Sequence, residues 1–189
     1  MKKSAIIIAI LAVVIIIAIS LGGSYNGIVA KAEEVDNKFA TIDTQLQRRA
    51  DLIPNLVNTV KGYAAQEKEI IASVTEARAK LAGAKTVGEK ANADEELTSA
   101  LNRLLVVVEN YPELKANENF SQLQEELQNT ENKIAFSRQF YNDVATKYNT
   151  KLEVVPSNII ASMFHFEAVE LFEAESQEAR KNVKVDFNK

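Results

Sequence analysis

The sequence predicts an all-α protein, with an N-terminal transmembrane helix followed by an elongated bundle of helices. Residues 4–30 contain no charged side chain, and about 20 consecutive apolar residues are enough to cross a bilayer core as a helix. Beyond this run, apolar residues recur every three or four positions, which is the spacing of one helix face. The 189-residue chain has only six Gly and three Pro, so little interrupts helix formation.

Residues 1–24 are predicted to be a membrane anchor, because residues 5–19 are wholly apolar. The alternative is a cleaved secretory signal, since Ala18-Ile19-Ser20 has small residues at a suitable spacing. The length of the run and the helical pattern after it favour an anchor. Lys2 and Lys3 precede the run and acidic residues follow it, so the positive-inside rule places the body outside the cytoplasm. We therefore expect a single pass through the inner or plasma membrane.

Residues 25–163 are predicted to form the bundle. Its longest helix, 120–152, holds no Gly or Pro and would extend roughly 50 Å at 1.5 Å per residue. Heptad spacing gives this helix two buried columns, which are Phe120, Leu127, Ile134, Tyr141 and Tyr148, and Leu123, Thr130, Ser137, Val144 and Lys151. A first helix is expected to end in a turn or kink at 48–54, because Pro54 disfavours helix at the residue before it. A second helix should cover 54–81 and a third, the most buried, about 93–110.

Composition and motifs argue against an enzyme. The chain has no Cys, which excludes disulfides, thiolate metal sites and cysteine nucleophiles, and its only histidine is His165. The sequence contains no Gly-rich phosphate loop, serine nucleophile elbow or His-Glu-x-x-His motif. The net charge of −4 does not favour nucleic acid as a partner. We expect no cofactor and no metal.

Residues 164–189 are predicted to form an apolar patch followed by a charged tail. The candidate residues for partner contact are Phe164, Phe166 and Phe172. Most such patches cap the end of a bundle; the alternative is a docking surface for a partner or for the membrane. The apolar residues spread around a helix, so we expect Phe164 or Phe172 to stay accessible. Alternation in 183–187 indicates a short strand or an extended tail.

One carboxylate falls inside an apolar column. Glu67 occupies the column of Val60 and Val74. It either faces water at the rim of the bundle or points inward to a facing Arg or Asn, because an unpaired buried charge is costly. The second possibility predicts an internal polar site near Glu67 and Arg78.

Several long motifs, in order along the chain, resemble those of the bacterial LemA family. They include Arg48-Arg49-Ala50-Asp51-Leu52-Ile53-Pro54-Asn55, Val74-Thr75-Glu76-Ala77-Arg78-Ala79, Tyr111-Pro112-Glu113-Leu114-Lys115-Ala116, Tyr148-Asn149-Thr150 and Pro156-Ser157-Asn158. The resemblance covers nearly the whole chain. It implies one membrane helix and an antiparallel four-helix bundle with bromodomain-like, up-and-down topology, and it implies no known enzymatic activity. Ala50 departs from the larger residue expected there.

Two functions follow as hypotheses. The first is a membrane-tethered scaffold or adaptor of the bacterial cell envelope, whose partner is another envelope protein. The second is a ligand-binding or catalytic bundle with its polar site near Glu67 and Arg78. The sequence leaves the oligomeric state open.

The anchor generates a first prediction. Residues 4–23 should remain attached in the mature protein, because their length suits a membrane span and a helical stripe continues directly from them. Mass spectrometry of the membrane-extracted protein measures the N-terminus. A mature chain that begins at Leu21 or Gly23 would contradict the prediction.

Overall fold

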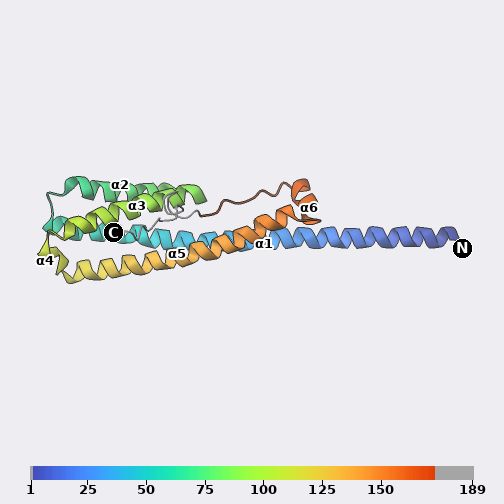
Figure 1. The fold of residues 1–189 in the computed structure, drawn as a ribbon, viewed down its shortest axis with the longest axis horizontal. Coiled ribbons are helices and arrows are strands. Elements are labelled where there is room, and N and C mark those ends of the chain that lie inside the picture. The colour runs from blue at the N-terminus through green and yellow to red at the C-terminus, as the bar shows by residue number, and fades with distance from the viewer. Residues whose placement is uncertain (1, 173–189) are drawn as a thin grey trace, which may run out of the picture. The chain divides into compact units, whose positions relative to one another are not determined.

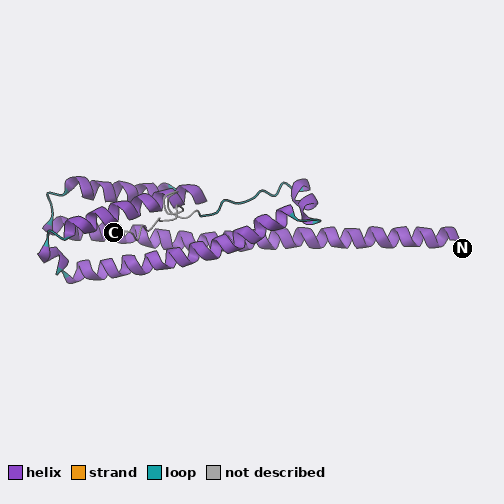
Figure 2. Cartoon of the chain, in the orientation of Figure 1, coloured by secondary structure: helices purple, strands orange, loops and turns teal. Residues whose placement is uncertain are grey.

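The computed structural model describes residues 2–172, with side chains from residue 6 onward, and within this part the chain forms only helices and loops (Figures 1 and 2). The prediction of an all-helical protein is confirmed for this part; the alternation at 183–187 lies outside it. The six helices are α1 (Lys2–Tyr63), α2 (Lys68–Gly83), α3 (Val87–Val108), α4 (Pro112–Lys115), α5 (Glu118–Glu153) and α6 (Ser157–Met163).

The chain divides into two compact units. Among the described residues, unit 1 comprises 2–41 together with 139–170, and unit 2 comprises 42–138 together with Leu171 and Phe172. Because α1 and α5 each pass from one unit into the other, the two units share continuous helices. Each unit has its own set of buried side chains, described in turn below.

Unit 1 contains the apolar N-terminal part of α1, where every residue from 6 to 20 is exposed. This part of α1 is long and apolar enough to cross a membrane. Farther along the helix, Ile28 and Val35 are buried. On α5, Tyr141, Val144 and Tyr148 are buried, as the two predicted columns require. The Phe39 and Tyr141 rings lie 6.1 Å apart, which links α1 to α5.

Unit 2 has a core of apolar side chains from five helices. Its buried members include Leu46, Ile53 and Val60 on α1, Val74 and Leu81 on α2, Leu97, Leu101 and Leu104 on α3, Leu114 on α4, and Phe120 and Ile134 on α5. The start of α3 is defined by a capping box. The Glu89 backbone N–H donates to Thr86 Oγ1 at 3.1 Å, and the Thr86 backbone N–H donates to Glu89 Oε2. The two bonds to backbone N–H groups at 85 and 86 lower the pKa of Glu89.

The predicted break at 48–54 is wrong, because α1 continues through Pro54 to Tyr63. Proline inside a helix lacks the N–H that would bond the carbonyl four residues earlier, here that of Ala50. In the structure Arg78 Nε of α2 donates to this carbonyl oxygen at 2.9 Å. A side chain of the next helix thus replaces the missing backbone bond. The turn between α1 and α2 lies instead at residues 64–67.

The third helix also differs from the prediction. It begins at Val87 and not near residue 93. Leu97, Leu101, Leu104 and Val108 of this helix are buried, whereas Val106 is 71% exposed. Adjacent residues of a helix point in different directions. When several apolar residues follow one another, only some of them can face the core, and the others are exposed.

The Arg78–Ala50 bond generates a second prediction. Arg78→Met should cost about 1–3 kcal/mol of unfolding free energy, because it leaves a buried carbonyl without a donor. In a Pro54→Ala background the new residue-54 N–H can bond the Ala50 carbonyl, so the same Arg78 change should cost clearly less. A double-mutant cycle of urea denaturation measures the difference. Equal costs in the two backgrounds would show that Arg78 does not replace the missing bond.

Candidate functional site

Glu67 and Arg78 do not form the internal polar site that the sequence suggested as an alternative. Glu67 lies half-buried in the turn before α2 and accepts a 2.7 Å hydrogen bond from the Tyr111 hydroxyl. This bond raises the pKa of Tyr111, because it stabilises the neutral phenol. Gln66 donates to the same hydroxyl oxygen at 2.8 Å. Arg78 donates to the Ala50 carbonyl instead. Glu67 and Arg78 therefore take part in two separate contacts and do not face each other.

A cluster of buried charges lies elsewhere in unit 2, centred on Asp94 of α3. Asp94 is 1% exposed. Its Oδ1 accepts from Arg49 Nη1 of α1 at 2.5 Å, and its Oδ2 accepts from Arg138 Nη2 of α5. The Glu131 carboxylate lies 2.7 Å from Arg49 Nη1, and Arg49 Nη2 donates to Thr98 Oγ1 at 2.9 Å. One carboxylate therefore joins three helices.

The cluster is electrically balanced, with two guanidinium groups facing two carboxylates. Side-chain exposure is 4% for Arg49, 2% for Asp94, 17% for Arg138 and 30% for Glu131. Charges this deeply buried are tolerated only when they are paired and hydrogen-bonded. The Nε atoms of Arg49 and Arg138 are nevertheless buried without a hydrogen-bond partner. The arrangement suits fixing the register of the helices, since each partner must meet Asp94 at one position along its helix.

The sequence contained a signal for this cluster that was not used. Arg49 follows Ile28, Val35 and Ile42 at intervals of seven, so it occupies a buried column of α1. Asp94 lies three residues before Leu97 on the buried stripe of α3. A charged residue in a column of buried apolar residues needs a partner. This holds for Arg49 and Asp94 as it does for Glu67, and it predicts that both are paired.

A cavity of about 190 Å³ lies beside Arg49, between α1, α3 and α5. Its apolar lining is Leu56, Leu101, Leu104, Leu105 and Leu127, and its polar lining includes Thr98, Asn102, Gln124 and Gln128. Such a lining suits a small, largely apolar molecule with one or two hydrogen-bonding atoms. Among the described residues, no group of three or more His, Asp or Glu is placed to hold a metal ion.

The three phenylalanines predicted for partner contact lie in different surroundings. Phe164 is 53% exposed, Phe166 is half-buried and Phe172 is only 4% exposed. Within unit 2, the Arg138 guanidinium lies 5.3 Å from the centroid of the Phe172 ring, in a cation–π contact. Of the two rings expected to stay accessible, Phe164 is accessible and Phe172 is not, because Phe172 packs into the bundle.

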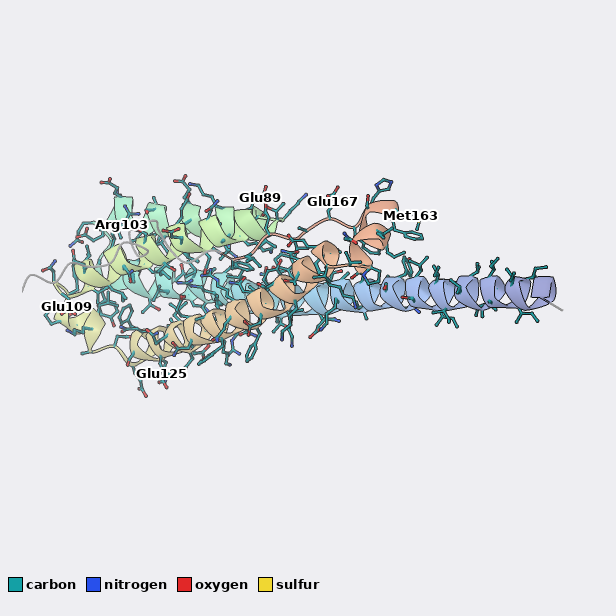
Figure 3. The ribbon with its side chains drawn as sticks, turned by 45° about the vertical axis from the view of Figure 1, so that its right-hand side comes forward. Glu89, Arg103, Glu109, Glu125, Met163 and Glu167 are labelled. Atoms are coloured by element: carbon teal, nitrogen blue, oxygen red, sulfur yellow. The ribbon has the colours of Figure 1, made fainter. Side chains whose placement is uncertain are left out.

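The segment after α6 is held along α5 by Tyr141, Tyr148 and Asn149 of that helix. Tyr148 Oη donates to the Glu167 carbonyl at 3.1 Å, and Tyr141 Oη donates to the Glu170 carbonyl at 2.8 Å. The Asn149 side chain bonds both the N–H and the carbonyl of Val169, each at 2.9 Å. Burial raises the pKa of both tyrosine hydroxyls. Figure 3 labels Met163, the last residue of α6, and Glu167 in the segment that follows it.

The ion cluster generates a third prediction. Arg49→Met should lower the unfolding free energy by about 3–5 kcal/mol, because it leaves the buried Asp94 with one cation instead of two. Arg48→Met is the matched control: its guanidinium is 54% exposed and lies 3.8 Å from Glu126, so its loss should cost no more than about 1 kcal/mol. Thermal and urea denaturation measure both. Similar losses for the two variants would contradict the assigned role of the cluster.

Comparison with known proteins agrees with the motifs. The chain is 28% identical over 193 residues to the magnetosome proteins MamQ 1 and MamQ 2 of Paramagnetospirillum magneticum, which covers 88% of this chain and 71% of each relative. It is 26% identical to the protein LemA of Metamycoplasma hominis, over 80% of this chain and 70% of that relative. The model of the LemA family matches residues 38–187. This chain therefore belongs to the LemA family.

Proposed function

We propose that this protein is a membrane-tethered helical scaffold or adaptor of the bacterial cell envelope, and not an enzyme. The observation that carries the proposal is the continuity of α1. One helix, Lys2–Tyr63, begins in an apolar segment of membrane-spanning length and ends among the buried side chains of unit 2. The apolar segment thus continues into the rest of α1 without a loop between them.

The proposed organisation follows the sequence. Residues 1–24 form a single-pass anchor in the inner or plasma membrane, 25–163 form the up-and-down four-helix bundle, and 164–189 form the patch and tail. In this proposal the bundle lies outside the cytoplasm, on the side opposite Lys2 and Lys3. Two of the relatives are named for the magnetosome and not for a reaction, which supports a non-catalytic role.

A surface for a partner protein is proposed on α5. Phe136 is 64% exposed and Phe140 is 57% exposed. Each ring is a large apolar side chain left exposed on α5. Aromatic side chains are enriched in protein interfaces and costly to leave in water. The proposed occupant is another envelope protein.

A photo-cross-linking experiment tests the adaptor function and is the fourth prediction. A photoreactive phenylalanine analogue at position 140 of the full chain should cross-link to a defined envelope protein in cells. The control position is the exposed Thr146, which lies about 120° around the same helix at 100° per residue. Both variants should keep the parent's melting temperature. Equal cross-linking from the two positions, or none from position 140, would overturn the proposed partner surface.

A further inference from the structure

We infer that α6 lies in the membrane interface, so that the chain contacts the lipid surface at a second place beside its spanning helix. This inference rests on the proposed function, because it takes the apolar part of α1 to cross the bilayer. All of the residues that carry it belong to unit 1.

The first observation is a cluster of exposed apolar side chains around α6, here called the α6 patch. Its members are Val154, Val155, Ile159, Met163 and Phe164, with exposed fractions of 47, 78, 58, 58 and 53%. Ile159 and Met163 are four residues apart and share one face of α6. A group of large apolar side chains left in water marks a contact surface.

The second observation is how the opposite face of α6 is held. Ile160 and Ala161 are 2% and 4% exposed, so this face is used by the protein itself. The helix ends with the Phe166 N–H bonded to the Ala161 carbonyl at 2.9 Å and His165 in the left-handed region, with φ 56°. This is the hydrogen bond of a Schellman end. The outward direction of Ile159 and Met163 is therefore fixed by packing.

The third observation places α6 at the level of the membrane boundary. The Tyr25 ring lies 4.8 Å from the Phe164 ring and 5.9 Å from the Phe166 ring. Tyr25 comes two residues after Gly23, where the apolar run of α1 ends, which is about 3 Å along the helix axis. Aromatic residues at this position belong to the headgroup region. The patch therefore begins where the spanning segment emerges.

A second contact sits at the same level. The Lys151 ammonium of α5 lies against Gly27 of α1, in the space that a larger side chain at 27 would fill. A lysine with its stem against a helix and its charge at the boundary is typical of membrane interfaces. Apolar side chains facing outward, an aromatic cluster and a lysine at one level together match a lipid surface better than a protein partner.

The consequence is mechanical. A single spanning helix leaves a protein free to rotate about the helix axis and to tilt. An interfacial contact through the α6 patch adds a second point of attachment, to one side of α1, and so fixes the rotation of unit 1 about that axis.

Depth-dependent quenching of tryptophan fluorescence tests this, and is the fifth prediction. The chain has no Trp, so each single substitution introduces one emitter into the full-length protein, reconstituted in phosphatidylcholine vesicles. Lipids brominated either near the headgroup or near the bilayer centre report depth. Ile159→Trp should lose emission with bromines near the headgroup. Its matched reference, Ile15→Trp in the anchor, should lose emission most with bromines near the centre. Gln139→Trp, at an exposed site of unit 1 on α5, lies twelve residues from Lys151, about 18 Å along the helix axis, and should be unaffected.

The outcomes separate the two proposals. Quenching of Ile15→Trp without quenching of Ile159→Trp would leave the anchor standing and overturn the interfacial placement of α6. The same conclusion would follow from a blue-shifted but unquenched Ile159→Trp, which would indicate a protein or a second copy over the patch. Absence of quenching in both variants would overturn the anchor as well. Quenching of Gln139→Trp to the same extent as Ile159→Trp would indicate non-specific adsorption and also contradict the inference.

Discussion

A carboxylate that is 1% exposed, Asp94, is the constraint on which unit 2 depends. Removed from water, it must be met by cations, and the chain supplies Arg49 from α1 and Arg138 from α5. Each guanidinium reaches Asp94 only at one axial position of its helix, so the interaction selects one register among the many that aliphatic stripes allow. Buried ion pairs contribute little net stability compared with apolar packing. Their value here is specificity, because Leu and Ile side chains in heptad columns are nearly interchangeable under a shift of one heptad.

A polar contact between two helices also accounts for the continuity of α1 at Pro54. The proline removes one hydrogen bond, and the freed Ala50 carbonyl is satisfied by Arg78 of α2. This hydrogen bond connects α2 to α1 one turn before the proline. At the other end of α2, Glu67 and Tyr111 make a comparable link through a 2.7 Å hydrogen bond. Glu67 and Arg78, which the sequence suggested as a polar site, form hydrogen bonds in the structure that connect neighbouring parts of the chain.

In unit 1 the corresponding role falls to tyrosine and asparagine. The hydroxyls of Tyr141 and Tyr148 and the amide of Asn149 bind backbone groups of the segment that follows α6. Backbone groups without secondary structure need such partners wherever they are removed from water. The segment is thereby held along α5, and its start brings Phe164 and Phe166 to Tyr25. These contacts join the segment after α6 to α1 just beyond its apolar run.

Periodicity by itself determined the helical class, the apolar N-terminal run and part of the buried face of α5, because the spacing of apolar residues dictates which face of a helix leaves water. In the predicted columns Phe120, Ile134, Tyr141 and Tyr148 are buried, whereas Leu123, Leu127, Ser137 and Lys151 are half-buried. Periodicity placed a turn at Pro54, which was wrong, and it left Glu67 either at the rim of the bundle or paired inward near Arg78; the structure pairs Glu67 with Tyr111. Whether a proline breaks a helix depends on a donor from another helix, and whether two charges meet depends on how helices are set against each other. The Arg49–Asp94–Arg138 cluster and the burial of Phe172 were decided in the same way, by side chains far apart in the sequence. Local propensity carries no information about such partners, so only the tertiary structure could decide them.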